Sequence, residues 1–494
     1  MTTSTIAQDS NETDAPHRRR KPSWQLMGTL FVALIMLAVG IWLRLHDLGV
    51  PFDRDSYDEG VYWQTLRSMS TGHSLYQQTF YSQPPIFILS VYPFYALFGQ
   101  SIWAARLGIV VISLIGLLGA ALLGWALRRH IGVLVALLLL VANPLYLAQS
   151  QTLEAEMPCV AFALLSVALV YLWWEHPDGA AGIVLAVLTS VTAVLSIFGK
   201  LFGLAVLVPI VLLALAHVWR VYRRPMQERQ YKYKYSMTSL LIGIAAAAIT
   251  GVLLLLPFIS SWHQLVQSVI TFHLAASKIF HSSQANNFSI ISQVLVTPLG
   301  LLALLGTIVA LLRRDWLVLP LLAWMLATLY LLWNEVPLFT HHLVILVPPL
   351  VALVTMCVIP FLFSLRLPQR SVNQGDHKGT PLRWTSPVIV AAAIIMLLFV
   401  VADSGINLLQ SRSYLREVHG QAMSIPTSPA AGVVADIRAE TQPGQLIITD
   451  AQFLVAQAGR STPSDLVDTS SVRIQSGYLT SQQLISAAAL PQVH

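Results

Sequence analysis

The chain has 494 residues, of which 55% are hydrophobic and only 11% are charged. Soluble proteins carry about 25% charged residues, so this composition excludes a soluble globular protein and indicates a polytopic membrane protein. The net charge of +6 does not indicate a nucleic-acid partner, because Lys and Arg gather beside the cytoplasmic ends of membrane helices. Cys159 and Cys357 both lie within apolar runs, so neither a disulfide framework nor a cysteine metal site is expected.

The predicted membrane spans are eleven apolar runs, each near the roughly 17 to 25 residues that a helix needs to cross a bilayer. They cover residues 24–43, 103–127, 131–148, 157–174, 180–198, 201–219, 237–258, 288–312, 316–333, 341–365 and 386–404. When the N-terminus is placed inside, most of the 29 Lys and Arg residues fall in short inner segments, as the positive-inside rule requires. The sequence therefore predicts an all-α multi-pass protein of the plasma (inner) membrane, with a cytoplasmic N-terminus and an extracytoplasmic C-terminus.

Three regions follow from this topology: a cytoplasmic tail at 1–23, a membrane domain at 24–404 whose first extracytoplasmic loop covers 44–102, and an extracytoplasmic tail at 405–494. In the C-terminal tail, "GVVADIRAETQPG" predicts a helix and "AQFLVAQAGR" predicts another. Between them, "QLIITD" predicts a buried strand. We therefore expect a small α/β appendage that docks on the outer face.

The stretch "DRDSYDEGVYW" in the first loop crowds four carboxylates into a chain poor in charge: Asp53, Asp55, Asp58 and Glu59. If a helix begins near Ser56, the last three of them share one face. Such a cluster can bind a divalent cation through its oxygens, or supply a base that deprotonates a hydroxyl. The alternative is a capping box formed by Ser56 and Glu59, which leaves the first two aspartates unexplained.

Further ionisable residues lie at the predicted outer ends of helices: Glu154, Glu156, Lys200, His341, His342 and Arg106. Carboxylates from two different loops are what a site needs to combine a base with a second acidic group, and a histidine pair can contact a phosphate or a metal. Solvated carboxylates, a snorkelling lysine and an arginine anchored to headgroups are the alternatives.

Missing motifs narrow the choice of function. The sequence has no P-loop, no G-x-G-x-x-G and no H-E-x-x-H motif, so no nucleotide cofactor is expected. The carboxylates lie at outer helix ends and not in mid-span, which argues against an ion-coupled transporter. A transporter or flippase of a lipid-linked sugar, and an inactive scaffold, remain as alternatives to an enzyme.

Three motifs in sequence order, "DSYDEGVYW", "SQPPIFILSVYPFYALFG" and "WAARLG", resemble the GT-C superfamily of integral-membrane glycosyltransferases. The resemblance is to the protein O-mannosyltransferase and aminoarabinose-transferase branch, glycosyltransferase family 39, and it covers roughly residues 24–365. "LEAEMP", "GKLFGLAVLVP" and "HHLVILVPPLVAL" extend it. The chain departs from the family at Gln83, where many relatives have His or Lys, and at "SIFG" before Lys200, so the identity of the substrate is not carried over.

The resemblance implies a GT-C arrangement of helices and transfer of a sugar from a polyprenyl-phosphate donor to a hydroxyl of a glycan, lipid or protein. It implies that Asp58 is the base, that Glu59 orients the acceptor or a metal, and that Glu156 is the second acidic group, with Asp55 and Glu154 as further acidic candidates. The residues that would balance the phosphate charge are Lys200, His341, His342 and Arg106. A divalent cation held by Asp58 and Glu59 is the one cofactor that the resemblance allows.

Overall fold

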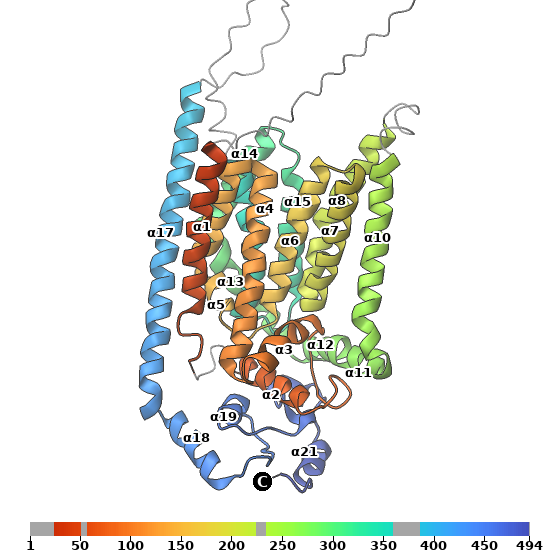
Figure 1. Cartoon of the computed structure of the whole chain (residues 1–494), viewed down its shortest axis with the longest axis vertical. Helices are drawn as coiled ribbons and strands as arrows, with labels where there is room; N and C mark the ends of the chain where they lie inside the picture. The colour runs from red at the N-terminus through yellow and green to blue at the C-terminus, as the bar shows by residue number, and fades with distance from the viewer. Residues whose placement is uncertain (1–23, 51–56, 224–233, 359–385, 494) are drawn as a thin grey trace, which may run out of the picture.

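The structure is a computed structural model that describes residues 24–50, 57–223, 234–358 and 386–493. A bundle of long helices is closed at one end by shorter helices and by the C-terminal tail (Figure 1). The long helices of the bundle are α1 (Trp24–Leu45), α4 (Ile102–Ala142), α6 (Glu156–Glu175), α7 (Gly179–Gly199), α8 (Leu207–Tyr222), α10 (Lys234–Leu255), α14 (Pro298–Leu312), α15 (Val318–Asn334), α16 (Val347–Val358) and α17 (Ser386–Ser424).

Among the described residues, fewer separate helices than predicted are long and apolar enough to cross a membrane. Seven described helices are long and apolar enough to cross a membrane, or eight if a bent pair forms one span, so the predicted count of eleven is not confirmed. The bent pair is α13 (Gln284–Leu295) and α14, which meet at an angle of 81° where Thr297 and Pro298 start a new helix. Helix α15 and the segment Thr340–Met356 are apolar but shorter.

Helix α4 contains two of the predicted runs joined by a sharp reversal. The backbone leaves helical geometry at Arg128 and at Arg129, which has a φ of 52°. A Cβ on Gly124 would meet the carbonyl oxygen of Gly132 at 2.2 Å, and the converse distance is 2.0 Å. Eight residues of straight helix would separate these glycines by about 12 Å, so α4 folds back on itself at the arginine pair.

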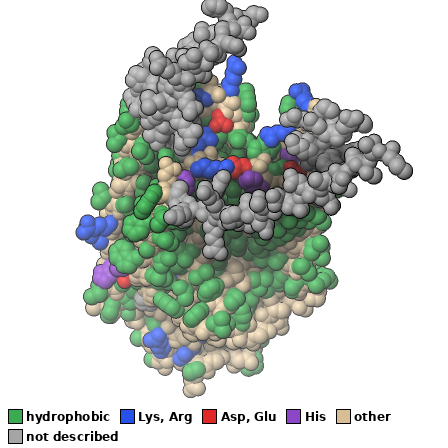
Figure 2. Space-filling view, turned by 45° about the horizontal axis from the view of Figure 1, so that its top comes forward, with side chains coloured by type: hydrophobic (Ala, Val, Ile, Leu, Met, Phe, Trp, Pro, Cys, Tyr) green, Lys and Arg blue, Asp and Glu red, His purple; other side chains and the backbone are tan. Residues whose placement is uncertain are grey.

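The surface of the bundle is divided by polarity. Hydrophobic side chains cover much of its sides, and Lys and Arg side chains gather near the end that lies opposite the tail (Figure 2). Such a division is what the positive-inside rule uses to orient a membrane protein. The cytoplasmic location of the N-terminus stays a prediction.

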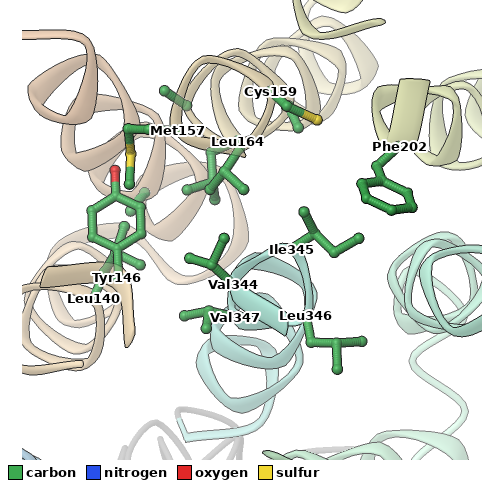
Figure 3. Packing of buried hydrophobic residues seen from close by; sticks show 14 of the residues in the cluster. Leu140, Tyr146, Met157, Cys159, Leu164, Phe202, Val344, Ile345, Leu346 and Val347 are labelled. Carbon is green, nitrogen blue, oxygen red and sulfur yellow. The ribbon is translucent and has the colours of Figure 1, made fainter. Parts of the chain in front are cut away.

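The bundle core contacts the start of α16 and the short helix before it, which carries two of the predicted site residues. Leu140, Leu164, Val344 and Val347 are buried together where α4, α6 and the start of α16 meet (Figure 3). This packing fixes the 3₁₀ helix η5 (Thr340–Leu346), which leads directly into α16.

The first loop forms two helices, α2 (Asp58–Ser70) and α3 (Ile86–Leu97). Helix α3 begins after Pro84 and Pro85, contains Pro93 and has 12 residues, so it is too short to span, as the sequence predicts. The residue before α2 is Tyr57, which makes no side-chain cap. Ser56, the predicted cap, lies outside the described residues, as do Asp53 and Asp55.

The C-terminal tail is helical, and the prediction of an α/β appendage is wrong. Helices α18 (Pro429–Glu440) and α19 (Gln452–Gln457) confirm the two predicted helices, and α20 (Ser471–Gln475) and α21 (Ser481–Ala488) follow. In place of the predicted strand, Leu446 makes isolated bridges to Ser461 and to Val493. A β-strand needs a neighbour over several residues, and the described tail residues provide none.

The tail packs on the first loop through α19 and α2. The rings of Trp63 and Phe453 lie 5.2 Å apart, edge to face. Gln64 donates from Nε2 to the carbonyl of Gln452 at 3.2 Å and accepts from the backbone nitrogen of Thr462 at 3.3 Å. Gly60 allows this approach, because a Cβ there would stand 2.5 Å from the nitrogen of Phe453.

We expect a Gly60→Ala substitution to loosen the tail without unfolding the bundle. The added methyl group forces α19 away from α2, and such overpacking costs about 1–3 kcal/mol. Limited trypsin digestion after Arg460 should then accelerate by at least roughly fivefold. Gly251→Ala in α10 is the matched control, because nothing lies within 4 Å of the place that its new methyl group would take; equal digestion of the two variants would contradict the docking.

Candidate active site

A cavity of about 670 Å³ lies where the first loop, the turn after α7, η5 and the tail meet. The first loop contributes Asp58, the first residue of α2, and the turn after α7 contributes Lys200. Helix η5 contributes His341 and His342, and the tail contributes Asp468. Groups from four separate parts of the sequence therefore face one space.

Glu156 is the centre of a buried polar cluster next to this cavity. It is the first residue of α6 and is fully buried. Its Oε1 forms an ion pair with Nζ of Lys200 and lies 3.7 Å from Nε2 of His341 and 3.5 Å from Nε2 of His342. The structure thus brings together four residues that the sequence predicts for the site.

The ion pair is positioned by packing between α6 and α7. Ser196, in the last turn of α7, donates to the carbonyl of Cys159 in α6 at 2.8 Å. Burial lowers the pKa of Lys200, but the charge of Glu156 and their hydrogen bond outweigh this effect, and the net pKa is raised. Lys200 therefore remains an ammonium group at neutral pH.

A second acidic group approaches the cluster from the first loop. Ligand atoms of Asp58, Glu154 and His341 lie within 4.8 Å of one another. Asp58 lines the cavity, whereas Glu154 is fully buried behind it. The expected combination of carboxylates from two loops is therefore present, and it is centred on Asp58.

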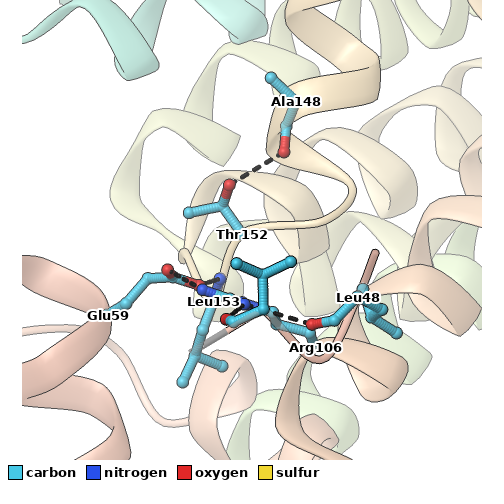
Figure 4. A network of polar contacts seen from close by, with 7 residues as sticks. Leu48, Glu59, Arg106, Ala148, Thr152 and Leu153 are labelled. Carbon is cyan, nitrogen blue, oxygen red and sulfur yellow. Dashed lines mark hydrogen bonds and ion pairs between the residues drawn. The ribbon is translucent and has the colours of Figure 1, made fainter. Parts of the chain in front are cut away.

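Glu59 and Arg106 form a buried ion pair outside the cavity. Both side chains are fully buried, and neither lines the cavity. Arg106 donates from Nε to Oε1 of Glu59 at 2.9 Å and from Nη2 to Oε2 at 2.5 Å, and its Nη1 donates to the carbonyls of Val50 at 2.7 Å and Leu48 at 3.2 Å (Figure 4). The same Oε1 accepts from the nitrogen of Leu153 at 2.7 Å.

This geometry places Glu59 and Arg106 in a cross-link between the first loop and α4. Neither side chain lines the cavity that contains Asp58 and Lys200, so the phosphate-binding role of Arg106 and the acceptor- or metal-orienting role of Glu59 stay predictions. A bidentate guanidinium–carboxylate pair engages both oxygens of the acid, so the described contacts of Glu59 are those of a buried cross-link, and its capping partner Ser56 lies outside the described residues.

The family model for dolichyl-phosphate-mannose-protein mannosyltransferases matches residues 71–266. No curated protein matches the chain in sequence. The structure of ArnT from Cupriavidus metallidurans bound to undecaprenyl phosphate is similar, with 17% identity, a TM-score of 0.61 and coverage of 92% of this chain and 89% of that chain. The apo state of ArnT gives 14% identity, a TM-score of 0.58 and the same coverage.

The chain is similar in sequence to membrane mannosyltransferases over residues 71–266, and it shares the fold of the ArnT structures. The family match spans α3, α4, α6, α7 and α8, and so contains Glu156 and Lys200. The shared fold extends over 92% of the chain. The resemblance stated from the sequence motifs is confirmed.

Several ionisable residues that line this cavity were not predicted as site residues, and Glu335 and Asp468 are two of them. Glu335 lines it, and burial raises its pKa, although the charge of Lys200 opposes this. Asp468 lies 3.4 Å from the hydroxyl of Tyr57, which accepts from the nitrogen of Thr469 at 2.9 Å. "NEVPLF" in a predicted outer turn was a signal for Glu335, whereas no sequence pattern pairs the tail with the first loop.

Two sets of residues in the described part of the chain that touch this cavity could hold a metal ion: Glu156 with His341 and His342, and Asp58 with Glu154 and His341. The first set has the two imidazoles and one carboxylate of many zinc sites. Lys200 pairs with the same oxygen of Glu156 that faces both histidines, so its ammonium group would compete with a cation for that oxygen, whereas Oε2 of Glu156 has no hydrogen-bond partner among the described residues. The second set includes Asp58, which faces the cavity directly.

Proposed function

We propose that this glycosyltransferase moves a sugar from a polyprenyl-phosphate donor to an acceptor hydroxyl on the extracytoplasmic face. The observation that carries the proposal is the presence, around one cavity, of a carboxylate on α2, the ammonium group of Lys200 and the imidazoles of His341 and His342. Such a site can accept a proton from one substrate and bind the phosphate of another. The similar fold of an ArnT structure that holds undecaprenyl phosphate supports this class of donor.

In the proposed reaction, Asp58 accepts the proton of the acceptor hydroxyl as its oxygen bonds to the anomeric carbon. The bond between that carbon and the phosphate oxygen breaks, and polyprenyl phosphate leaves with the electron pair. Attack from the face opposite the phosphate inverts the configuration. One base is enough for this step, because the phosphate needs no proton to leave when a cation neutralises it.

Lys200 is the proposed cation for the leaving phosphate. Its ammonium lies between the buried Glu156 and the open cavity, so a phosphate entering from the cavity would meet it directly. His341 and His342 line the same wall and add hydrogen-bond donors. Glu156 is then a positioning residue that keeps Lys200 charged and in place.

The proposal is tested by turnover of purified protein in nanodiscs with a panel of radiolabelled polyprenyl-phosphate sugars and candidate acceptors. Release of free polyprenyl phosphate by wild type, but not by Asp58→Asn, would support it. Labelled donor lipid that crosses the bilayer when the protein is reconstituted in vesicles, without any acceptor or turnover, would favour a flippase. A folded protein that binds donor and neither cleaves nor moves it would favour a scaffold.

We expect Lys200→Gln to lower kcat by roughly 10²–10³-fold, the usual effect of removing one preorganised group that stabilises developing charge. Because this change leaves Glu156 buried without its ammonium partner, the double variant Lys200→Gln/Glu156→Gln separates stability from chemistry. It should recover the Tm and remain inactive. Lys278→Gln, at an exposed lysine of α12 (Phe272–Ile279), is the control; recovery of activity in the double variant would refute the role of Lys200.

A further inference from the structure

A second cavity, of about 420 Å³, lies between the end of α1 and the middle of α17. It shares no lining residue with the catalytic cavity. Helix α1 and the turn after it supply Trp42, Leu43 and His46, and α17 supplies Leu408, Arg412, Leu415, Arg416 and His419. The α17 residues recur at helical spacing, so they form one face of that helix.

The charged groups of this cavity are mainly basic. Nε2 of His46 and Nδ1 of His419 each lie 3.1 Å from the same oxygen, Oδ2 of Asp47. Arg412 and Arg416 have no ion pair with an acidic side chain in the described part of the chain. Among the described residues, one carboxylate therefore lies beside two guanidinium groups and two imidazoles, which gives these groups a net positive charge at neutral pH.

The cavity also lies where the apolar surface of the bundle gives way to polar surface. Helix α1, an apolar candidate span, ends at Leu45. The side chain of Trp42 is 63% exposed, and tryptophan at the end of a span is typical of the membrane–water interface. Exposed Leu408 and Leu409 continue the apolar surface along α17. A ligand here would meet positive charge on one side and hydrocarbon on the other.

We propose that this cavity binds the phosphate headgroup of an anionic phospholipid. Guanidinium groups bind phosphate oxygens through paired hydrogen bonds, and Arg412 and Arg416 are one turn apart on α17. The leucine side chains and Trp42 provide the contact for the acyl chains. This inference does not depend on the proposed glycosyl transfer, because it uses none of the catalytic residues.

A divalent cation is the competing occupant, since ligand atoms of His46, Asp47 and His419 lie within 4.8 Å of one another. The two guanidinium groups that line the same cavity repel a cation and attract a phosphate. The charge of the whole cavity therefore favours the lipid.

Native mass spectrometry of the full chain in neutral detergent tests the proposal, with phosphatidylglycerol titrated against phosphatidylcholine. We expect one saturable phosphatidylglycerol per protein and no comparable site for phosphatidylcholine. Arg412→Gln/Arg416→Gln should weaken that site at least tenfold, because each basic residue near a headgroup contributes roughly fivefold. The matched control is Arg220→Gln on α8, another arginine beside a tryptophan, whose guanidinium lies 4.1 Å from the ring centroid of Trp174.

Four results would overturn the proposal. Equal binding of the two lipids, or an equal loss with Arg220→Gln, would show only general attraction of arginines to headgroups. Glycerol phosphate that binds as tightly as the lipid would assign the cavity to a soluble ligand. A rise in Tm with Zn²⁺ that His419→Ala abolishes, without any preference for phosphatidylglycerol, would assign it to a cation.

Discussion

Replacing Arg106 with glutamine is expected to destabilise the protein more than any change on its surface. The substitution leaves the carboxylate of Glu59 fully buried and without its bidentate partner. Breaking a buried ion pair by removing one member costs about 3–5 kcal/mol. We expect a clear fall in Tm, followed by tryptophan fluorescence in detergent, and loss of the contacts that tie Leu48 and Val50 to α4.

The matched control is Arg129→Gln, because Arg129 pairs with Glu175 at a similar N–O distance of 2.9 Å while being 49% exposed. Exposed pairs contribute about 0–1 kcal/mol, so its Tm should change little. The double variant Glu59→Gln/Arg106→Gln should be more stable than Arg106→Gln alone, since no charge is then left buried. A Tm for Arg106→Gln as high as that of the control would contradict the cross-link.

The single variant Glu59→Gln tests whether Glu59 acts in catalysis. If Glu59 only holds the first loop, the activity of Glu59→Gln per folded molecule should stay near that of wild type. A folded Glu59→Gln protein without activity would return Glu59 to the acceptor-orienting role that the family resemblance implies.

Much of the fold was predictable because the bilayer imposes simple rules on sequence. Long apolar runs must form helices when no water is present to bind their backbone groups, and the first-loop helices were marked by prolines and apolar spacing. The span count was not predictable, because composition does not show that two predicted runs join in α4, that α13 and α14 bend by 81°, or that α15 and the segment Thr340–Met356 are short. The prediction of an α/β tail was wrong for another reason. "QLIITD" has the pattern of a strand, but the described tail residues include no second strand to pair with it.

For the candidate site, the sequence identified which ionisable residues to consider. It did not show which of them contact one another. Glu156, Lys200, His341 and His342 were each singled out as ionisable residues at outer helix ends, and the fold gathers them around one oxygen. Arg106 fitted the same description, but it does not line the cavity. It pairs instead with Glu59, which is 47 residues away along the chain, so no local pattern shows this pairing. A local pattern cannot distinguish a cation that faces a cavity from one that closes a buried ion pair.

Asp58→Asn is expected to reduce sugar transfer by roughly 10²–10⁴-fold, the usual contribution of a general base. Asparagine keeps the size of the side chain but does not accept a proton. The Tm and the affinity for a polyprenyl-phosphate sugar should change little, because the phosphate is assigned to Lys200 and the histidines. Asp436→Asn, at an exposed aspartate of α18, is the matched control and should behave as wild type.

An acceptor that carries no proton separates a base from other roles for Asp58. Azide is already an anion, so its attack on the anomeric carbon needs no deprotonation. If Asp58 is the base, Asp58→Asn should transfer sugar to azide at a rate near that of wild type while transfer to hydroxyl acceptors remains slow. If both reactions fail in a folded, donor-binding variant, Asp58 instead orients the donor or holds a cation with Glu154 and His341, whose ligand atoms lie within 4.8 Å.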